Sequence, residues 1–238
     1  MPPSCSQNAA LTHPKASEPA FPCLLMLCTG NAARSVMAGA IARHVIGEGP
    51  PETGTVSGAS SGGSGSTDRR GFLVMTAGTH AVEGQPMSPR TRSALNAIGL
   101  DGYPTAAFHR SHQLTEEDLS SADLVVAMAR EHVDYVRRYH PEAASKTATL
   151  HWLVEHLPQR RGHLAERLGD LNLSAISCHE QGEVSDPAGG DDAQYLACAK
   201  ELAELVPLLV MLTWPPQEKH LSVGRHGTTS NPAKATGG

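Results

Sequence analysis

Short apolar runs alternate along the chain with segments of helical periodicity. Residues 24–28, LLMLC, form an apolar run without alternation, which is typical of a strand buried on both faces of a parallel sheet. In the next segment, 35–49, apolar residues recur at helical spacing until Gly47 and Gly49. This pattern predicts a helix that ends at a glycine.

The same alternation continues through the rest of the chain. Further strands are predicted at 72–77, 123–128 and 147–153, and further helices at 89–98, 114–121, 130–139 and 191–213. Thr115 is the expected N-cap of one helix, with Asp118 in the capping-box position. We therefore expect an α/β fold with a small four-stranded parallel sheet, helices on both faces, and ligands at the carboxyl ends of the strands.

Some segments are poor in the large apolar residues that build a core. Residues 1–20 and 215–238 are expected to be disordered extensions, and the Gly/Ser-rich residues 50–70 a flexible insertion. The remaining composition predicts one domain over residues 21–214. Within it, residues 158–182 are polar and irregular, which indicates a loop or a short helix.

The charge balance excludes some classes of partner. With 19 basic and 24 acidic side chains, the chain has no excess of positive charge for nucleic acid or an anionic membrane. Apolar runs are far shorter than the roughly 18 residues that span a bilayer, and the first 20 residues lack a signal-peptide pattern. We expect a cytoplasmic protein, and the sequence does not indicate its oligomeric state.

The cysteines are expected to be free thiols. The chain has five, an odd number, at irregular spacings, which argues against a disulfide framework. No CxxC pair or His/Cys cluster indicates a zinc site. We expect no metal and no cofactor.

Candidate chemistry lies in the turn after the first predicted strand. Cys28 ends the strand and Arg34 begins the helix, so the turn between them places backbone N–H groups and the positive end of a helix dipole together. This arrangement predicts a phosphate-binding loop between strand 1 and helix 1. Its residues are Thr29, Gly30, Asn31, Ala32, Ala33, Arg34 and Ser35.

The residue types in this turn suit an oxyanion. Gly30 is expected to permit unusual backbone angles, and Asn31 to tolerate left-handed geometry and brace the loop with its amide. Arg34 can hold two oxygens at once. The positive field favours a thiolate on Cys28, to which Ser35 could donate its hydroxyl.

The segment CTGNAARS resembles the signature loop of the low-molecular-weight protein-tyrosine phosphatases. Asp186-Pro187, before the last predicted helix, stands at the place of the family's Asp-Pro. Residues 76–79 (TAGT) and 109–128 are also similar to the family, and the resemblance covers most of residues 22–213.

The resemblance implies a mechanism. Cys28 attacks phosphorus and forms a phosphocysteine, while Arg34 and the loop amides stabilise the oxygens. Asp186 protonates the leaving oxygen and later deprotonates the attacking water, and no metal is needed. The implied substrate is a protein carrying phosphotyrosine, with phosphoarginine or a small phosphate ester as alternatives.

The chain departs from the family at several positions. Ala33 stands where the family often has a cysteine before the loop arginine. A protective disulfide between Cys28 and that position is therefore not available. Small or imidazole side chains at 80–82 and 188–189 replace aromatic residues that often line the pocket, and Ala32 could widen its mouth. We interpret His109 as structural.

Two alternatives stay open. A class of arsenate reductases shares the loop but relays a disulfide through two further cysteines, which are missing after the third predicted strand at 128–130. A reductase that uses Cys28 alone with an external thiol does not need them and is the second hypothesis. The other alternative is a non-catalytic anion-binding module.

Overall fold

The computed structural model describes residues 22–47, 73–100, 108–160 and 162–213. The predicted extensions at 1–20 and 215–238 and the predicted insertion at 50–70 lie outside the described residues.

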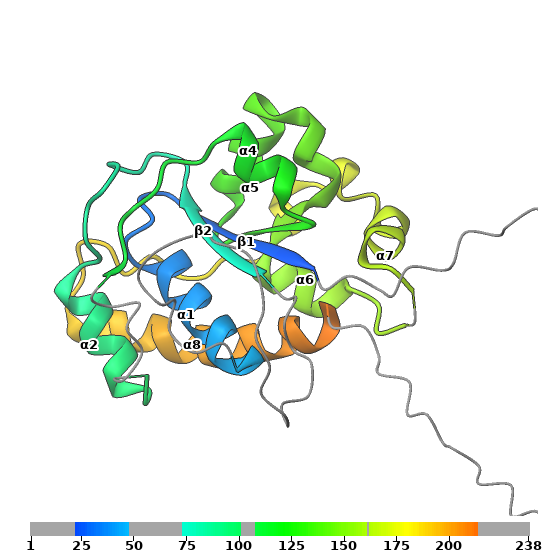
Figure 1. Ribbon diagram of the computed structural model, residues 1–238. Coiled ribbons are helices and arrows are strands. Elements are labelled where there is room, and N and C mark those ends of the chain that lie inside the picture. The colour runs from blue at the N-terminus through cyan, green and yellow to red at the C-terminus, as the bar shows by residue number, and fades with distance from the viewer. Residues whose placement is uncertain (1–21, 48–72, 101–107, 161, 214–238) are drawn as a thin grey trace, which may run out of the picture.

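A four-stranded parallel sheet forms the centre of the molecule (Figure 1). Its strands are β1 (Cys23–Cys28), β2 (Leu73–Gly78), β3 (Leu124–Ala127) and β4 (Thr147–Thr149), in the order β2-β1-β3-β4. Leu24 of β1 is aligned with Val74 of β2 and with Leu124 of β3. The predicted α/β class and the four-stranded parallel sheet are therefore confirmed.

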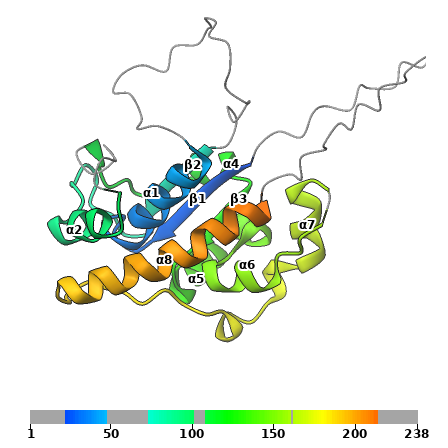
Figure 2. The same ribbon diagram turned by 90° about the horizontal axis from the view of Figure 1, so that it is seen from below.

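Helices cover both faces of the sheet (Figures 1 and 2). On one face Leu24, Met26 and Cys28 belong to the core formed with α1 (Arg34–Ile46), α2 (Pro89–Ala97), α6 (Leu150–His156) and α8 (Asp192–Thr213). On the other face Leu25 and Leu27 pack with α4 (Glu116–Ser121) and α5 (Arg130–Tyr139). All six residues of β1 are buried, as expected for a central strand with cover on both sides.

The predicted helix boundaries have the expected local causes. Gly47 ends α1 with a left-handed φ of 73°, and Gly99 follows α2 with a φ of 84°. At the start of α4, Thr115 Oγ1 accepts from Asp118 N, and the Asp118 carboxylate accepts from Thr115 N at 2.9 Å. The capping box predicted there is confirmed.

Two predicted segments differ in the structure. The strand expected over 147–153 ends at Thr149, because Thr149 Oγ1 accepts from Trp152 N and caps α6 instead. Residues 158–182 contain one helix, α7 (Leu164–Leu171), and two short 3₁₀ helices, η2 (Leu173–Ala175) and η3 (Cys178–Glu180). A further 3₁₀ helix, η1 (Pro141–Lys146), precedes β4.

The long C-terminal helix α8 packs beside α1 on the same face of the sheet (Figure 2). Leu202, Val206 and Leu209 of the predicted apolar face are buried, while Leu205 and Leu212 are partly buried. Among the described residues, no helix is long and apolar enough to cross a membrane.

Candidate active site

The turn after β1 forms a loop at the carboxyl edge of the sheet. Cys28, the last residue of β1, is 3% exposed, and Arg34 and Ser35 begin α1. The N-cap of α1 is Ala33, which offers no side-chain oxygen to the first amides of the helix. These amides are therefore available to an anion, as the sequence predicts.

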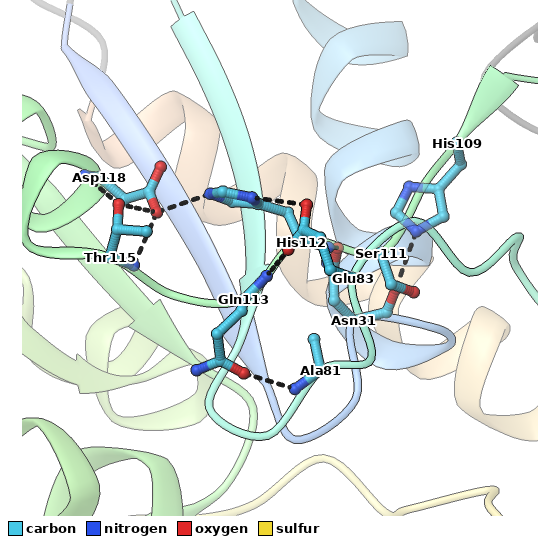
Figure 3. A network of polar contacts seen from close by, with 9 residues as sticks. All are labelled: Asn31, Ala81, Glu83, His109, Ser111, His112, Gln113, Thr115 and Asp118. Atoms are coloured by element: carbon cyan, nitrogen blue, oxygen red, sulfur yellow. Dashed lines mark hydrogen bonds and ion pairs between the residues drawn. The ribbon is translucent and has the colours of Figure 1, made fainter.

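Asn31 holds the shape of the loop from inside (Figure 3). Its φ is 49°, its side chain is buried, and its Oδ1 accepts from His112 N at 2.9 Å. Its carbonyl oxygen accepts from Ser111 Oγ and His109 Nε2, each at 2.8 Å. Both expectations for Asn31 are confirmed, and His109 contacts the loop through its backbone, which fits a structural interpretation.

The expectation for Gly30 is wrong. The left-handed backbone angle falls on Asn31 and not on Gly30, and a Cβ built on Gly30 would meet nothing within 4 Å. The glycine that the loop does require is Gly78, at the end of β2. A Cβ there would lie 2.6 Å from Thr29 O and 2.8 Å from Asn31 N, so only a hydrogen leaves room for the loop.

A polar cluster supports the segment that holds Asn31 (Figure 3). His112 Nε2 lies 2.8 Å from Asp118 Oδ2, and His112 Nδ1 lies 3.4 Å from Glu83 Oε1. Partial burial lowers the pKa of His112, but the two carboxylates outweigh this effect and raise the pKa overall. Gln113 adds a contact by accepting from Ala81 N at 2.8 Å.

Cys28 has a hydrogen-bond partner at the start of α1. Its Sγ lies 2.9 Å from Ser35 Oγ. Because Asn31 Nδ2 donates to Ser35 Oγ at 3.0 Å, the hydroxyl hydrogen of Ser35 is available to the sulfur. The predicted Ser35–Cys28 contact is present in the structure.

Three described cysteines outside the loop stay protonated at neutral pH. Burial is the main cause that raises the pKa of Cys23 and of Cys178 to about 11 and that of Cys198 to about 12. All four described cysteines are free thiols. Within the described part of the chain, no group of three His, Cys, Asp or Glu side chains could hold a metal ion.

Arg34 and Asp186 meet although 152 positions separate them. Arg34 Nη2 donates to Asp186 Oδ2 at 2.7 Å; the arginine side chain is 5% exposed and the aspartate 46%. Asp186 Oδ1 also accepts from Ala188 N at 3.0 Å. Val184 N donates to Met128 O at 2.9 Å, which ties the segment before Asp186 to the end of β3.

An ion pair also holds this segment, and sequence reasoning missed it. Glu183 Oε1 lies 2.9 Å from Arg130 Nε and from Arg130 N, and Oε2 lies 3.0 Å from Arg130 Nη2. These hydrogen bonds lower the pKa of Glu183 to about 2. The start of α5 is therefore clamped to the loop that carries Asp186.

A buried histidine beside the loop was also missed. His132 lies in α5, and its Nε2 is 3.0 Å from Thr29 Oγ1. Burial and the positive charge of Arg34 lower the pKa of His132 to about 3. No sequence motif marks this histidine, since its neighbour in the loop is 103 positions away.

The positions expected to be poor in aromatic side chains lie around the loop. Val82 is 66% exposed, and Ala188 and Gly189 are exposed after Asp186-Pro187. His80, whose backbone N donates to Thr29 O at 2.8 Å, packs edge-on against Tyr135 with 5.3 Å between ring centroids.

The chain is similar in sequence to known phosphatases. The family model described as "Low molecular weight phosphotyrosine protein phosphatase" matches residues 67–170, a range that includes neither the loop after β1 nor Asp186. A protein-arginine-phosphatase of Geobacillus stearothermophilus is 28% identical over 186 residues, which cover 78% of this chain and 92% of that protein. A low molecular weight phosphotyrosine protein phosphatase of Dictyostelium discoideum is 25% identical, covering 74% of this chain and 84% of that protein.

Solved structures show the same fold. The YwlE arginine phosphatase of G. stearothermophilus superimposes with a TM-score of 0.55 at 28% identity, covering 79% of this chain and 90% of that chain. A low molecular weight protein tyrosine phosphatase of T. tengcongensis gives a TM-score of 0.54 at 27% identity, covering 79% of this chain and 97% of that chain.

Proposed function

Because the chain belongs to the low molecular weight phosphotyrosine protein phosphatase family, we propose that it hydrolyses phosphate monoesters on proteins, without a metal, through a phosphocysteine. The observation that carries the proposal is the 2.7 Å contact between Arg34 and Asp186, at the loop that begins with Cys28. The contact joins Asp186 to the arginine of the loop, which supports the proposed roles of Cys28 as nucleophile, Arg34 as anion-binding cation and Asp186 as proton carrier.

In the first step, the Cys28 thiolate attacks phosphorus and an S–P bond forms while the bond from phosphorus to the leaving oxygen breaks. Asp186 gives its proton to that oxygen. The loop amides and Arg34 stabilise the negative charge on the other phosphoryl oxygens. They supply the stabilisation that a metal ion gives in metal-dependent enzymes. Only one nitrogen of the Arg34 guanidinium contacts Asp186 and Thr29, so further N–H groups can reach the phosphoryl oxygens.

In the second step, Asp186 takes a proton from water as the water attacks phosphorus. The S–P bond breaks, inorganic phosphate leaves, and the sulfur becomes a thiolate again. Ser35, 2.9 Å from that sulfur, can donate to the developing negative charge. Asp186 returns to its protonated form, so the cycle closes without a co-reactant.

Phosphotyrosine is the substrate we propose first, because the matching family model and the Dictyostelium relative are named for it. Phosphoarginine is the second candidate, and two observations favour it. The relative that is 28% identical over 78% of the chain is named a protein-arginine-phosphatase. In addition, Val82 is 66% exposed and Ala188 is exposed, so these positions offer little ring surface to a phenyl group. His80 and Tyr135 form the aromatic pair beside Thr29.

The proposal is tested by hydrolysis of p-nitrophenyl phosphate without added metal. We expect turnover in the wild type, none in Cys28→Ser, and retained binding of inorganic phosphate in that variant. Cys178→Ser is the matched control, because Cys178 lies in η3 and contacts Asp134 and Arg137 of α5. Turnover that persists in Cys28→Ser would refute the phosphocysteine.

Failure of the folded wild type to turn over would favour the other two functions. Reduction of arsenate with an added thiol would identify the reductase, and phosphate binding without either reaction would identify the binding module. Peptides with phosphotyrosine or phosphoarginine, compared by kcat/KM, separate the two proposed substrates.

A further inference from the structure

His132 is a buried group that the mechanism above does not use. It is the third residue of α5 and its side chain is 1% exposed. Ala129 N donates to its Nδ1 at 3.0 Å. Because Nδ1 accepts a hydrogen bond, a neutral ring carries its proton on Nε2.

The environment keeps this ring neutral. Burial is the largest cause that lowers the pKa of His132 to about 3, and the positive charge of Arg34 adds to it. Glu183 opposes this effect, and His80 reinforces it. At neutral pH, His132 is therefore a fixed donor through Nε2.

The donor is aimed at the first residue of the loop. Nε2 of His132 lies 3.0 Å from Thr29 Oγ1 and 3.3 Å from Glu131 Oε1. The Thr29 hydroxyl donates to Glu131 Oε1 at 3.0 Å, and Arg34 Nη2 donates to the same hydroxyl oxygen at 3.3 Å. A hydroxyl donates once and accepts twice, so His132, Arg34 and Glu131 use its full capacity.

We propose that His132 is a positioning residue, which fixes the Thr29 hydroxyl and through it the guanidinium of Arg34 for phosphoryl transfer. The proposal rests on the phosphatase function. Arg34 Nη2 has two partners, Thr29 Oγ1 and Asp186 Oδ2. Asp186 changes its protonation state in each step. Thr29 and the neutral His132 keep theirs, so among the described partners of Arg34 Nη2 the Thr29 hydroxyl is the one that can keep the guanidinium in place through the cycle.

The first test removes the hydroxyl and keeps the side-chain shape. We expect Thr29→Val to lower kcat about 10- to 100-fold, the cost of a small misplacement of a catalytic group, with a smaller change in KM. Thr29→Ser restores the hydroxyl and should recover most of the kcat that Thr29→Val loses. Valine has nearly the shape of threonine and serine is smaller, so we expect both variants to fold, which thermal unfolding checks.

The second test asks whether the two residues act together. His132→Ala should lower kcat as Thr29→Val does, and the double variant should lose no more than the worse single variant. His132→Gln, whose amide can donate to Thr29, should recover part of the lost rate. Additive losses, or equal kcat in Thr29→Val and Thr29→Ser, would overturn the proposal.

A third measurement does not depend on activity. ¹⁵N NMR of the wild type should find His132 neutral, with its proton on Nε2, from about pH 5 to pH 8. A proton on Nδ1, or titration in that range, would contradict the network even if the enzyme turns over. An inactive wild type with the expected tautomer would contradict the phosphatase function and leave the hydrogen-bond network standing.

Discussion

Gly78 offers a test in which the structure sets the size of the perturbation. Its φ is not in the left-handed region, so Gly78→Ala changes only the space at Cβ. That Cβ would lie 2.6 Å from Thr29 O and 2.8 Å from Asn31 N, whereas ordinary contacts begin at 3.4 Å. The loop backbone must therefore move by about 0.6–0.8 Å relative to β2.

The displacement strains the bonds that place the loop. Thr79 N donates to Cys28 O at 2.9 Å and His80 N to Thr29 O at 2.8 Å, so the loop cannot move away from β2 without lengthening them. A misplacement of about 1 Å can cost about 100-fold in rate. We expect kcat/KM of Gly78→Ala to fall about 10- to 100-fold, or roughly 1.4–2.7 kcal/mol of activation free energy.

The assay is hydrolysis of p-nitrophenyl phosphate, with thermal unfolding measured in parallel. Gly169→Ala in α7 is the matched control, because a Cβ there meets nothing within 4 Å. It should keep wild-type kcat/KM. A folded Gly78→Ala with kcat/KM within twofold of the wild type would refute the argument that this contact fixes the loop.

Two further predictions concern the loop that carries Asp186. Asp186→Ala should slow the hydrolysis of aryl phosphates with poor leaving groups most, because their leaving oxygen needs the proton that Asp186 donates. A series of leaving groups, measured as kcat, checks this, and equal slowing across the series would argue against an acid role. Glu183→Gln should lower the free energy of unfolding at pH 7 by about 0.2–1 kcal/mol, the range for exposed ion pairs. Since the folded state lowers the pKa of Glu183 to about 2, this difference should shrink as pH falls below about 4.5, and a difference that grows in acid would contradict it.

Local sequence signals predicted most of the fold. The apolar run that ends at Cys28, the capping box at Thr115 and the glycine after α1 each depend on neighbours within a few positions. The predicted fourth strand ends early because Thr149 Oγ1 caps α6, and Thr149 N donates at the same point to Gln181 Oε1 at 2.8 Å, a contact between distant segments. Periodicity cannot detect such a contact.

At the site, too, the sequence predicts what neighbouring residues determine and misses contacts between distant segments. The loop residues follow one another in the chain, so a motif could identify them together. His132 lies 103 positions beyond its partner Thr29, and Glu183 lies 53 positions beyond its partner Arg130. Neither spacing is a motif. The motif predicts that the loop needs its glycine at Gly30, whereas the structure requires one at Gly78, where β2 approaches the loop.

The central claim is that Cys28 carries the phosphoryl group between the two steps. Its most direct test is a rapid acid quench of the wild type and Cys28→Ser during turnover of p-nitrophenyl phosphate, followed by mass spectrometry of the Cys28 peptide. We expect one added phosphoryl group on Cys28 in the wild type. Turnover with no phosphoryl group on Cys28, or with the group on another residue, would contradict the mechanism.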